Sequence, residues 1–274
     1  MKFRVLLVLF LTLGVCSTSL RAQDDEESPL QAVSYKKPLY TGPIVGINKV
    51  ITTGQFASFA GSAQCPQFKD GSGTGFFAGW TCEYLLGKDA KTSTSSIIAR
   101  VLYDNFPTSF TVKGDQLPSL VNMNGRDTVI VSTVQHYTAL KYTTIDLDLV
   151  YRFNLGATPL GIDIGPTIGF ASTQTLTQEF QLISPDNVKL VHDPAAIRYS
   201  DDSRTAYLQD GPLKNGNKLR LSLKVGIQYE FIMKKLTLIP SINYNVALTN
   251  MNDESWRVNA LQFGIEARFP VKVF

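Results

Sequence analysis

The strictest constraint in this sequence is an alternation of apolar and polar residues that recurs along the chain. Between Lys218 and Ile232, apolar residues occupy every second position from Leu219 to Phe231, and polar, charged or small residues lie between them. Successive side chains of a β-strand point to opposite faces, so this pattern predicts a strand with one apolar and one polar face. A helix would repeat its apolar residues every three or four positions.

The same alternation predicts eight strands. Their expected ranges are 43–53, 76–84, 97–104, 142–155, 160–171, 218–232, 236–248 and 259–273. The polar faces carry full charges in mid-strand, namely Glu83, Arg100, Asp146, Asp148, Arg152, Asp163, Arg220, Lys224, Glu230, Glu266 and Arg268. Such residues face water in a soluble β-sandwich, whereas in a transmembrane β-barrel they face the interior. Apolar and polar residues alternate along the strands of both folds, so other features of the sequence have to distinguish the sandwich from the barrel.

The N-terminus predicts export from the cytoplasm. Lys2 and Arg4 precede an apolar run from Val5 to Val15, and Ala22 is followed by an acidic stretch. This is the layout of a secretory signal peptide, with cleavage expected after Ala22. The apolar run is too short to cross a bilayer as a helix, which needs roughly 20 residues. An alternative lipoprotein signal would use Cys16, but Val15 stands where a small residue is usual.

Connection lengths and aromatic residues favour the transmembrane barrel. The connections 87–96, 156–159 and 233–235 are short, and those between them are long, as in barrels with periplasmic turns and extracellular loops. Outward-facing aromatic residues are expected to form two interfacial belts. One belt would contain Tyr84, Tyr151, Phe153, Tyr229, Phe231 and Phe269, and the other Phe76, Tyr103, Phe170 and Phe263. We therefore predict an all-β fold, an eight-stranded antiparallel transmembrane β-barrel with short periplasmic turns and long extracellular loops.

The region 43–274 resembles the small bacterial outer-membrane β-barrel proteins with an OmpA-like barrel. The similarity rests on the opening segment 42–46, on the passage from Cys65 to Gly75, and on the closing strand with its terminal Phe274. The resemblance implies an outer-membrane location, assembly by the barrel-insertion machinery, and a structural or adhesive role. The sequence departs from it at Phe274, whose parity differs from that of Phe269. No peptidoglycan-binding domain is expected after the barrel.

The expected organisation is a signal peptide at 1–22, a periplasmic lead-in at 23–42 and the barrel at 43–274. An eight-stranded barrel is just wide enough for side chains to fill, so we expect the charged residues to plug the lumen by pairing. Asp146 and Asp148, with Arg152 on the same face, are interpreted as part of this structural network and not as a catalytic pair. We expect no catalytic, cofactor or metal site. A narrow porin or gated channel for small solutes is the alternative function.

Recognition is expected in the long loops 54–74, 105–141 and 174–217. Part of the second loop, around Val129–Val131, is expected to extend its flanking strands as a hairpin. The third loop contains His192-Asp193 and Asp201-Asp202, which invite comparison with outer-membrane proteases, but catalysis is not expected there. His136 is expected to be an exposed loop residue, and the glycine-rich run 71–75 a flexible loop end.

The positions of two cysteines and the charge balance argue against a disulfide and against nucleic-acid binding. Cys65 and Cys82 enter an oxidising compartment, but they are expected to lie near 23 Å apart at roughly 3.3 Å per residue, so we predict two separate thiols. The charge balance is 26 basic against 23 acidic residues, and removal of Lys2, Arg4 and Arg21 makes it neutral. Such a chain has no electrostatic reason to bind nucleic acid. The expected partners are outer-membrane lipid and lipopolysaccharide, the barrel-insertion machinery, and an extracellular ligand.

Overall fold

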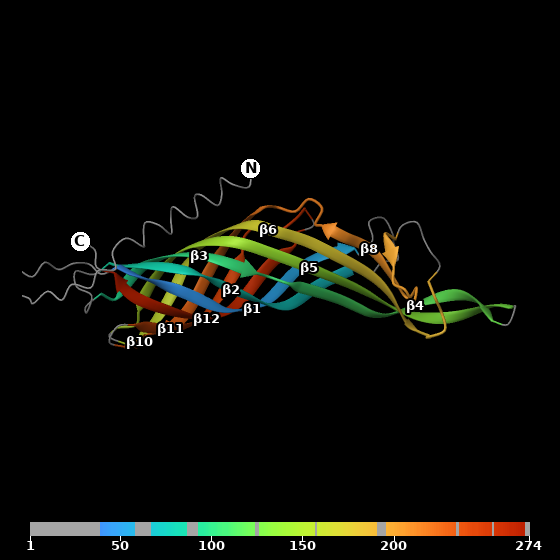
Figure 1. Ribbon diagram of the computed structural model, residues 1–274, viewed down its shortest axis with the longest axis horizontal. Coiled ribbons are helices and arrows are strands. Elements are labelled where there is room, and N and C mark those ends of the chain that lie inside the picture. The colour runs from blue at the N-terminus through green and yellow to red at the C-terminus, as the bar shows by residue number, and fades with distance from the viewer. Residues whose placement is uncertain are drawn as a thin grey trace, which may run out of the picture.

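The computed structural model describes residues 39–57, 67–86, 93–123, 126–156, 158–190, 196–233, 236–253 and 255–271. These residues form an antiparallel all-β structure (Figure 1). The long strands are β1 (Leu39–Ala57), β2 (Gln67–Leu85), β3 (Ser95–Asn105), β4 (Thr108–Met123), β5 (Arg126–Asn154), β6 (Leu160–Ser184), β9 (Leu219–Tyr229), β11 (Thr237–Ala247) and β12 (Arg257–Val271). Shorter strands are β7 (Arg198–Tyr199), β8 (Thr205–Pro212) and β10 (Phe231–Ile232). Within these ranges no helix is long and apolar enough to span a membrane.

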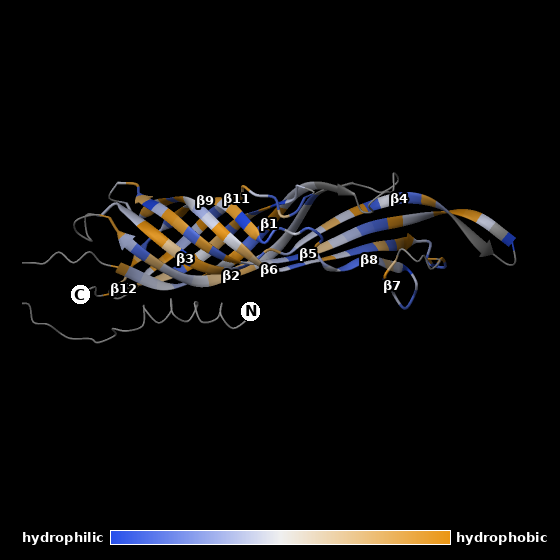
Figure 2. Ribbon diagram, turned by 90° about the horizontal axis from the view of Figure 1, so that it is seen from above, coloured by the Kyte–Doolittle hydropathy of each residue, from blue (hydrophilic) through white to orange (hydrophobic). Residues whose placement is uncertain are grey.

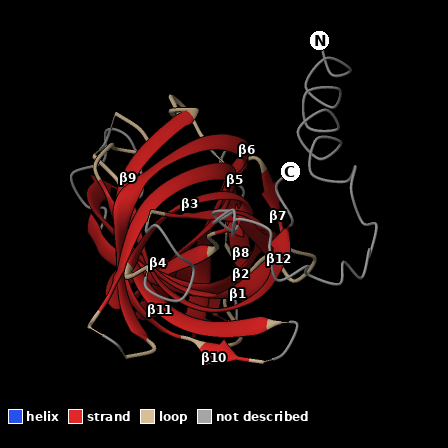
Figure 3. Ribbon diagram, turned by 90° about the vertical axis from the view of Figure 1, so that its left-hand side faces the viewer, coloured by secondary structure: helices blue, strands red, loops and turns tan. Residues whose placement is uncertain are grey.

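The strand pairings form a closed circuit. From β1 the antiparallel pairs run through β2, β3, β5, β6, β9, β11 and β12, and β12 pairs again with β1. The view along the long axis shows these strands surrounding an interior (Figure 3). The closing pair joins residues from opposite ends of the chain, such as Val45 with Ile265.

The expected alternation is confirmed on every strand of the circuit. In β9 the even-numbered residues from Arg220 to Gln228 are buried and the odd-numbered apolar residues are exposed. Apolar and polar residues consequently alternate along the ribbons of the circuit (Figure 2). All ten aromatic residues expected in the two belts have exposed side chains. Among these residues, ring centroids lie 4.8 Å apart for Tyr229 and Phe231, 5.9 Å for Phe76 and Tyr103, and 6.5 Å for Tyr151 and Phe153.

Pro240 explains why one of the expected strands is interrupted. The sequence predicts one strand over 218–232, but the structure divides it into β9 and β10 around Glu230. Gln228 pairs with Ser241 and Phe231 pairs with Leu238, so Pro240 lies on the ladder between these two pairs. A proline has no N–H to donate, and the ladder is therefore broken beside it.

Several long loops of the sequence analysis are wholly or partly strands. The glycine-rich run 71–75 was expected to be a flexible loop end, but it belongs to β2 and pairs with β1. Its glycines permit close packing: a Cβ on Gly73 or Gly75 would lie 1.9 Å from the carbonyl oxygen of Pro107 or Asn105. The glycines therefore allow neighbouring backbones to approach closely, and they do not mark a flexible segment.

The second and third long loops contribute to a sheet that projects beyond the circuit (Figure 1). We call it the projecting sheet; it contains β4, residues 126–141 of β5, residues 174–184 of β6, β8 and β7. The hairpin expected around Val129–Val131 is confirmed as the pair β4–β5. The strands β6, β7 and β8 were not expected within 174–217, because that segment has no clean period-two pattern.

Candidate functional site

The interior of the circuit holds the charged residues that the alternation singled out. Ten of the eleven are buried, and Glu230 is half-buried. At the end where β10 lies, Arg152 and Arg268 each contact both Glu83 and Glu230. The Arg152 Nη1–Glu230 Oε1 distance is 3.0 Å. Two guanidinium groups and two carboxylates from four different segments of chain are thereby joined in one cluster.

Arg100 connects this cluster to the middle of the interior. Its Nη2 lies 3.4 Å from both Asp163 Oδ2 and Glu266 Oε2. Glu266 Oε1 is in turn 3.6 Å from Arg268 Nε. One arginine on β3 therefore bridges carboxylates on β6 and β12, across the interior. Charges buried in this way are tolerated because each is paired.

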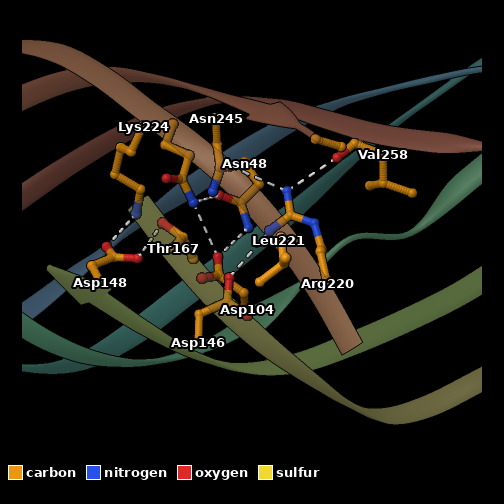
Figure 4. Close-up of polar contacts among 12 residues, drawn as sticks. Asn48, Asp104, Asp146, Asp148, Thr167, Arg220, Leu221, Lys224, Asn245 and Val258 are labelled. Atoms are coloured by element: carbon orange, nitrogen blue, oxygen red, sulfur yellow. Dashed lines mark hydrogen bonds and ion pairs between the residues drawn. The ribbon is translucent and has the colours of Figure 1, made fainter. Parts of the chain in front are cut away.

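The middle layer contains two separate ion pairs (Figure 4). Lys224 Nζ lies 2.5 Å from Asp148 Oδ2, and the Thr167 hydroxyl donates to Asp148 Oδ1 at 2.6 Å. Arg220 Nη1 lies 3.3 Å from Asp146 Oδ2. Asp146 and Asp148 thus each have a basic partner, and neither is exposed. Both carboxylates thus belong to the network of ion pairs inside the circuit.

Asp104 is an interior acid that the sequence analysis did not include among the charged set. Its Oδ1 accepts hydrogen bonds from Asn48 Nδ2 at 3.0 Å and from Gln262 Nε2 at 3.1 Å (Figure 4). Gln262 also donates to Asn48 at 2.9 Å. Asp104 falls on the inward parity, at the end of the expected strand 97–104. Its hydrogen-bond partners lie on β1 and β12, which only the closed circuit brings near β3.

An apolar cluster closes the interior beside the projecting sheet, a feature that the sequence analysis did not anticipate. Its buried residues are Val50, Phe68, Phe106, Phe110, Leu140, Tyr142, Leu176, Met251, Trp256, Val258 and Ala260. The Phe110 and Trp256 rings lie 5.4 Å apart, and the Arg220 guanidinium carbon lies 4.8 Å from the centre of the Phe106 ring. Arg220 therefore links the charged layer to the apolar one. The interior is filled by two chemically different layers.

His136 is buried in the projecting sheet, which corrects the expectation of an exposed loop residue. It pairs with Val112 and Phe180 on its two neighbouring strands, and its ring packs edge-on against Phe180 with centroids 5.1 Å apart. Its Nε2 lies 3.6 Å from Asp115 Oδ2. Burial lowers the pKa of His136, and the Asp115 carboxylate opposes that change. The strand pairing, invisible in a polar stretch of sequence, explains the burial.

Arg204 organises the turn that follows β6. Its guanidinium donates to five backbone carbonyl oxygens between Leu182 and Val188, at 2.7 to 3.1 Å. The nearby Ser200 hydroxyl donates to Asp202 Oδ1 at 2.5 Å and lowers the pKa of Asp202. Asp202 therefore shapes a turn. The segment 191–195, which contains His192 and Asp193, lies outside the described residues. Cys65 also lies outside them.

Comparison with solved structures finds similar chains at low sequence identity and with TM-scores below 0.5. The chain is similar to Ail, the attachment invasion locus protein of Yersinia pestis, solved with the heparin analogue sucrose octasulfate (10% identity, 85% of this chain and 100% of Ail covered, TM-score 0.33). It is also similar to Neisserial surface protein A (12% identity, 84% of this chain and 96% of that protein covered, TM-score 0.32). A third similar structure is the outer membrane protease OmpT of Escherichia coli (11% identity, 88% of this chain and 99% of OmpT covered, TM-score 0.28). No family model and no curated protein matches the sequence.

Proposed function

We propose that the chain is an integral protein of a bacterial outer membrane and crosses it as an eight-stranded antiparallel β-barrel. The observation that carries this proposal is the inverted polarity of the strand circuit. Its outer wall bears exposed apolar residues all the way round, whereas its interior holds paired charges. A water-soluble sandwich encloses its apolar face instead. Hydrocarbon solvates such an outer wall, and the closed circuit leaves no unpaired strand edge within it.

The interior supports a structural or surface-interaction role without transport or catalysis. Barrels of eight strands have an interior just wide enough for side chains. Here the ion pairs fill one part of it and the apolar cluster around Trp256 fills another. We therefore propose a plugged lumen. A narrow porin or gated channel remains the alternative that a flux measurement tests.

The projecting sheet is the proposed interaction surface. Short turns join β5 to β6 and β10 to β11, where Leu155 N–H donates to Leu160 and Met233 N–H donates to Leu236. In transmembrane barrels short turns usually face the periplasm, and this generalisation supports the proposal that the projecting sheet lies outside the cell. The proposal includes removal of residues 1–22, a lead-in at 23–42, insertion by the barrel-assembly machinery, contact with lipopolysaccharide, and an extracellular ligand on the projecting sheet.

The test is refolding of the mature chain into liposomes, followed by two measurements. Unboiled and boiled samples should migrate differently on a denaturing gel, because a closed barrel resists detergent until heated. Small sugars should not cross these liposomes faster than they cross empty ones, while a general porin in matched liposomes admits them.

Each outcome has one meaning. Sugar flux from heat-modifiable protein would replace the plugged scaffold by the porin alternative. Protein that stays in the aqueous phase and shows no gel shift would overturn the membrane proposal and favour a soluble sandwich.

A further inference from the structure

The interior of the circuit holds more acidic than basic side chains. Among the described residues that face it, the acids are Glu83, Asp104, Asp146, Asp148, Asp163, Glu230 and Glu266, and the bases are Arg100, Arg152, Arg220, Lys224 and Arg268. Two negative charges therefore have no positive counterpart. One belongs to the cluster at the β10 end, where Glu230 is half-buried and water can solvate it. The other belongs to the middle layer, whose charged side chains are all buried.

Asp104 is the acid of the middle layer that lacks a basic partner. Asp146 and Asp148 each form an ion pair there. Asp104 forms no ion pair with any described residue, and its Oδ1 accepts hydrogen bonds from two neutral amides, those of Asn48 and Gln262. Neutral donors orient a carboxylate but leave its charge in place. A buried charge without a counter-ion is strongly unfavourable, so such groups are paired or coordinate a cation.

Three oxygen atoms beside this uncompensated charge make no hydrogen bond within the described part of the chain. They are Asp104 Oδ2, Asp146 Oδ1 and Thr144 Oγ1, and all three residues are fully buried. Asp104 and Thr144 are direct partners on β3 and β5, and Asp146 is the next inward residue along β5. Side chains at such diagonal positions are within reach of one another. Asp104 and Asp146 lie close enough for their charges to interact (Figure 4).

Gly169 keeps space open beside Asp146. It is the direct partner of Asp146 on β6, it faces the interior, and a Cβ in its place would lie 2.4 Å from Asp146 Oδ1. Any other residue at this position would therefore press against the carboxylate. The glycine leaves this oxygen accessible from the interior.

The charge and the type of these oxygen atoms point to one class of ligand. A water molecule, or a rotated Thr144 hydroxyl, can hydrogen-bond to the carboxylates but leaves the charge of the layer unchanged. Carboxylate and hydroxyl oxygens are ligands that hard cations prefer. A single positive charge balances the layer, whereas Ca²⁺ carries two charges and takes about 6–8 oxygen ligands. We propose that Asp104, Asp146 and Thr144 bind one monovalent cation inside the circuit.

This site goes beyond the proposed function, because it concerns the interior of the circuit and not the medium outside it. The sequence analysis expected no metal site; the pairing of β3 with β5 is what brings these ligands together. Asp104 is also hydrogen-bonded to Asn48 on β1 and Gln262 on β12, the two strands that close the circuit. A cation that fixes Asp104 therefore stabilises the closed form. A ligand that binds only the folded chain stabilises it in proportion to the logarithm of its concentration.

The test measures unfolding of the refolded mature chain in detergent micelles, in NaCl and in choline chloride of the same concentration. Choline is too bulky for a buried site, and equal ionic strength keeps screening constant. For wild type, the equilibrium constant for unfolding should be about tenfold or more lower in NaCl than in choline chloride. Asp104→Asn keeps the shape of the side chain and removes the uncompensated charge, so this variant should unfold equally in the two salts.

Two further variants separate cation binding from general disruption. Asp163→Asn makes the same change at a buried acid that pairs with Arg100, and it should retain the difference between the salts. Thr144→Val removes the hydroxyl ligand without changing any charge. It should therefore need a higher Na⁺ concentration than wild type for half of the stabilisation.

The wild-type measurement alone can overturn the inference. Equal unfolding in the two salts would mean that no cation binds, and a response to pH without a response to Na⁺ would assign the balancing charge to a proton. Stabilisation by CaCl₂ but not by NaCl, or a Na⁺ response that Asp104→Asn retains in full, would also contradict the proposed site. These outcomes leave the barrel proposal intact if the protein shows its gel shift on heating. Loss of that shift from wild type in both salts would count against the closed circuit, and with it the site.

Discussion

At the scale of single residues, the buried ion pair between Lys224 and Asp148 offers the sharpest test of the interior. Removing one partner leaves a buried, uncompensated charge, which typically costs about 3–5 kcal/mol. We expect Lys224→Met to lower the free energy of unfolding by about that amount, because Asp148 then retains only the Thr167 hydroxyl among its close contacts. The denaturant midpoint of the heat-modifiable form in detergent micelles measures this change.

Two controls separate pairing from general disruption. Replacing both residues, as in Lys224→Met with Asp148→Leu, should cost less than the single change, since neither charge remains. Arg198→Met breaks the exposed pair with Asp210, where the Nη2–Oδ2 distance is 2.8 Å, and should cost about 0–1 kcal/mol. A double variant less stable than Lys224→Met would contradict the role assigned to this pair.

At the scale of the structural element, the projecting sheet should weaken in acid through His136. Burial holds the pKa of His136 below the ordinary value of about 6.5, so the opened sheet binds a proton more readily than the closed one. The stabilisation is complete above about pH 6.5 and is lost as the pH falls below that value. Amide hydrogen exchange along residues 126–141 of β5, corrected for the intrinsic pH dependence, should therefore speed up at pH 5 relative to pH 7.5.

The control is His136→Gln, which keeps a polar side chain but cannot titrate. Its exchange in β5 should show no such pH response, and exchange in β9, within the circuit, should be the same in both proteins. If His136→Gln responds to acid as strongly as wild type, another group controls the sheet. The expected effect is local because His136 is paired with β4 and β6 within the projecting sheet and contacts Asp115 and Phe180 there.

At the scale of the whole molecule, the circuit and the outer part of the projecting sheet should be separable. Lys113 and Gln135 are direct partners on β4 and β5, so the hairpin beyond them can be replaced by an Asn-Gly turn. We expect this shortened protein to insert into liposomes and to keep its gel shift on heating, because the ion pairs and the apolar cluster all lie below the cut. Failure to insert would show that the hairpin takes part in barrel assembly.

The edge of this hairpin also bears on its role. The strand β4 has a register shift at Gly114, whose φ is +91°, and it also contains Pro118. Bulges and prolines on an edge strand hinder the addition of further strands. Self-association of the shortened and full-length proteins, compared by light scattering in detergent, should therefore be equally low. Aggregation of the full-length protein alone would identify the hairpin edge as a pairing site.

The sequence alone determined the strands of the circuit and the direction of their side chains. A period of two is a local property of the chain, so residues such as Asp148 and Lys224 could be assigned to one face without knowing their neighbours. The same reasoning found the aromatic residues of the outer wall. It failed at 71–75 and at His136, where glycines and polar residues conceal strand pairing.

Tertiary structure decided which charged residues meet. Arg100 contacts carboxylates on β6 and β12, and Asp104 contacts amides on β1 and β12, because closure of the circuit brings distant strands across a shared interior. The apolar cluster around Trp256 arises in the same way, from residues far apart in the chain. Alternation specifies a face, whereas contacts depend on register and closure, which are long-range properties that no local pattern contains.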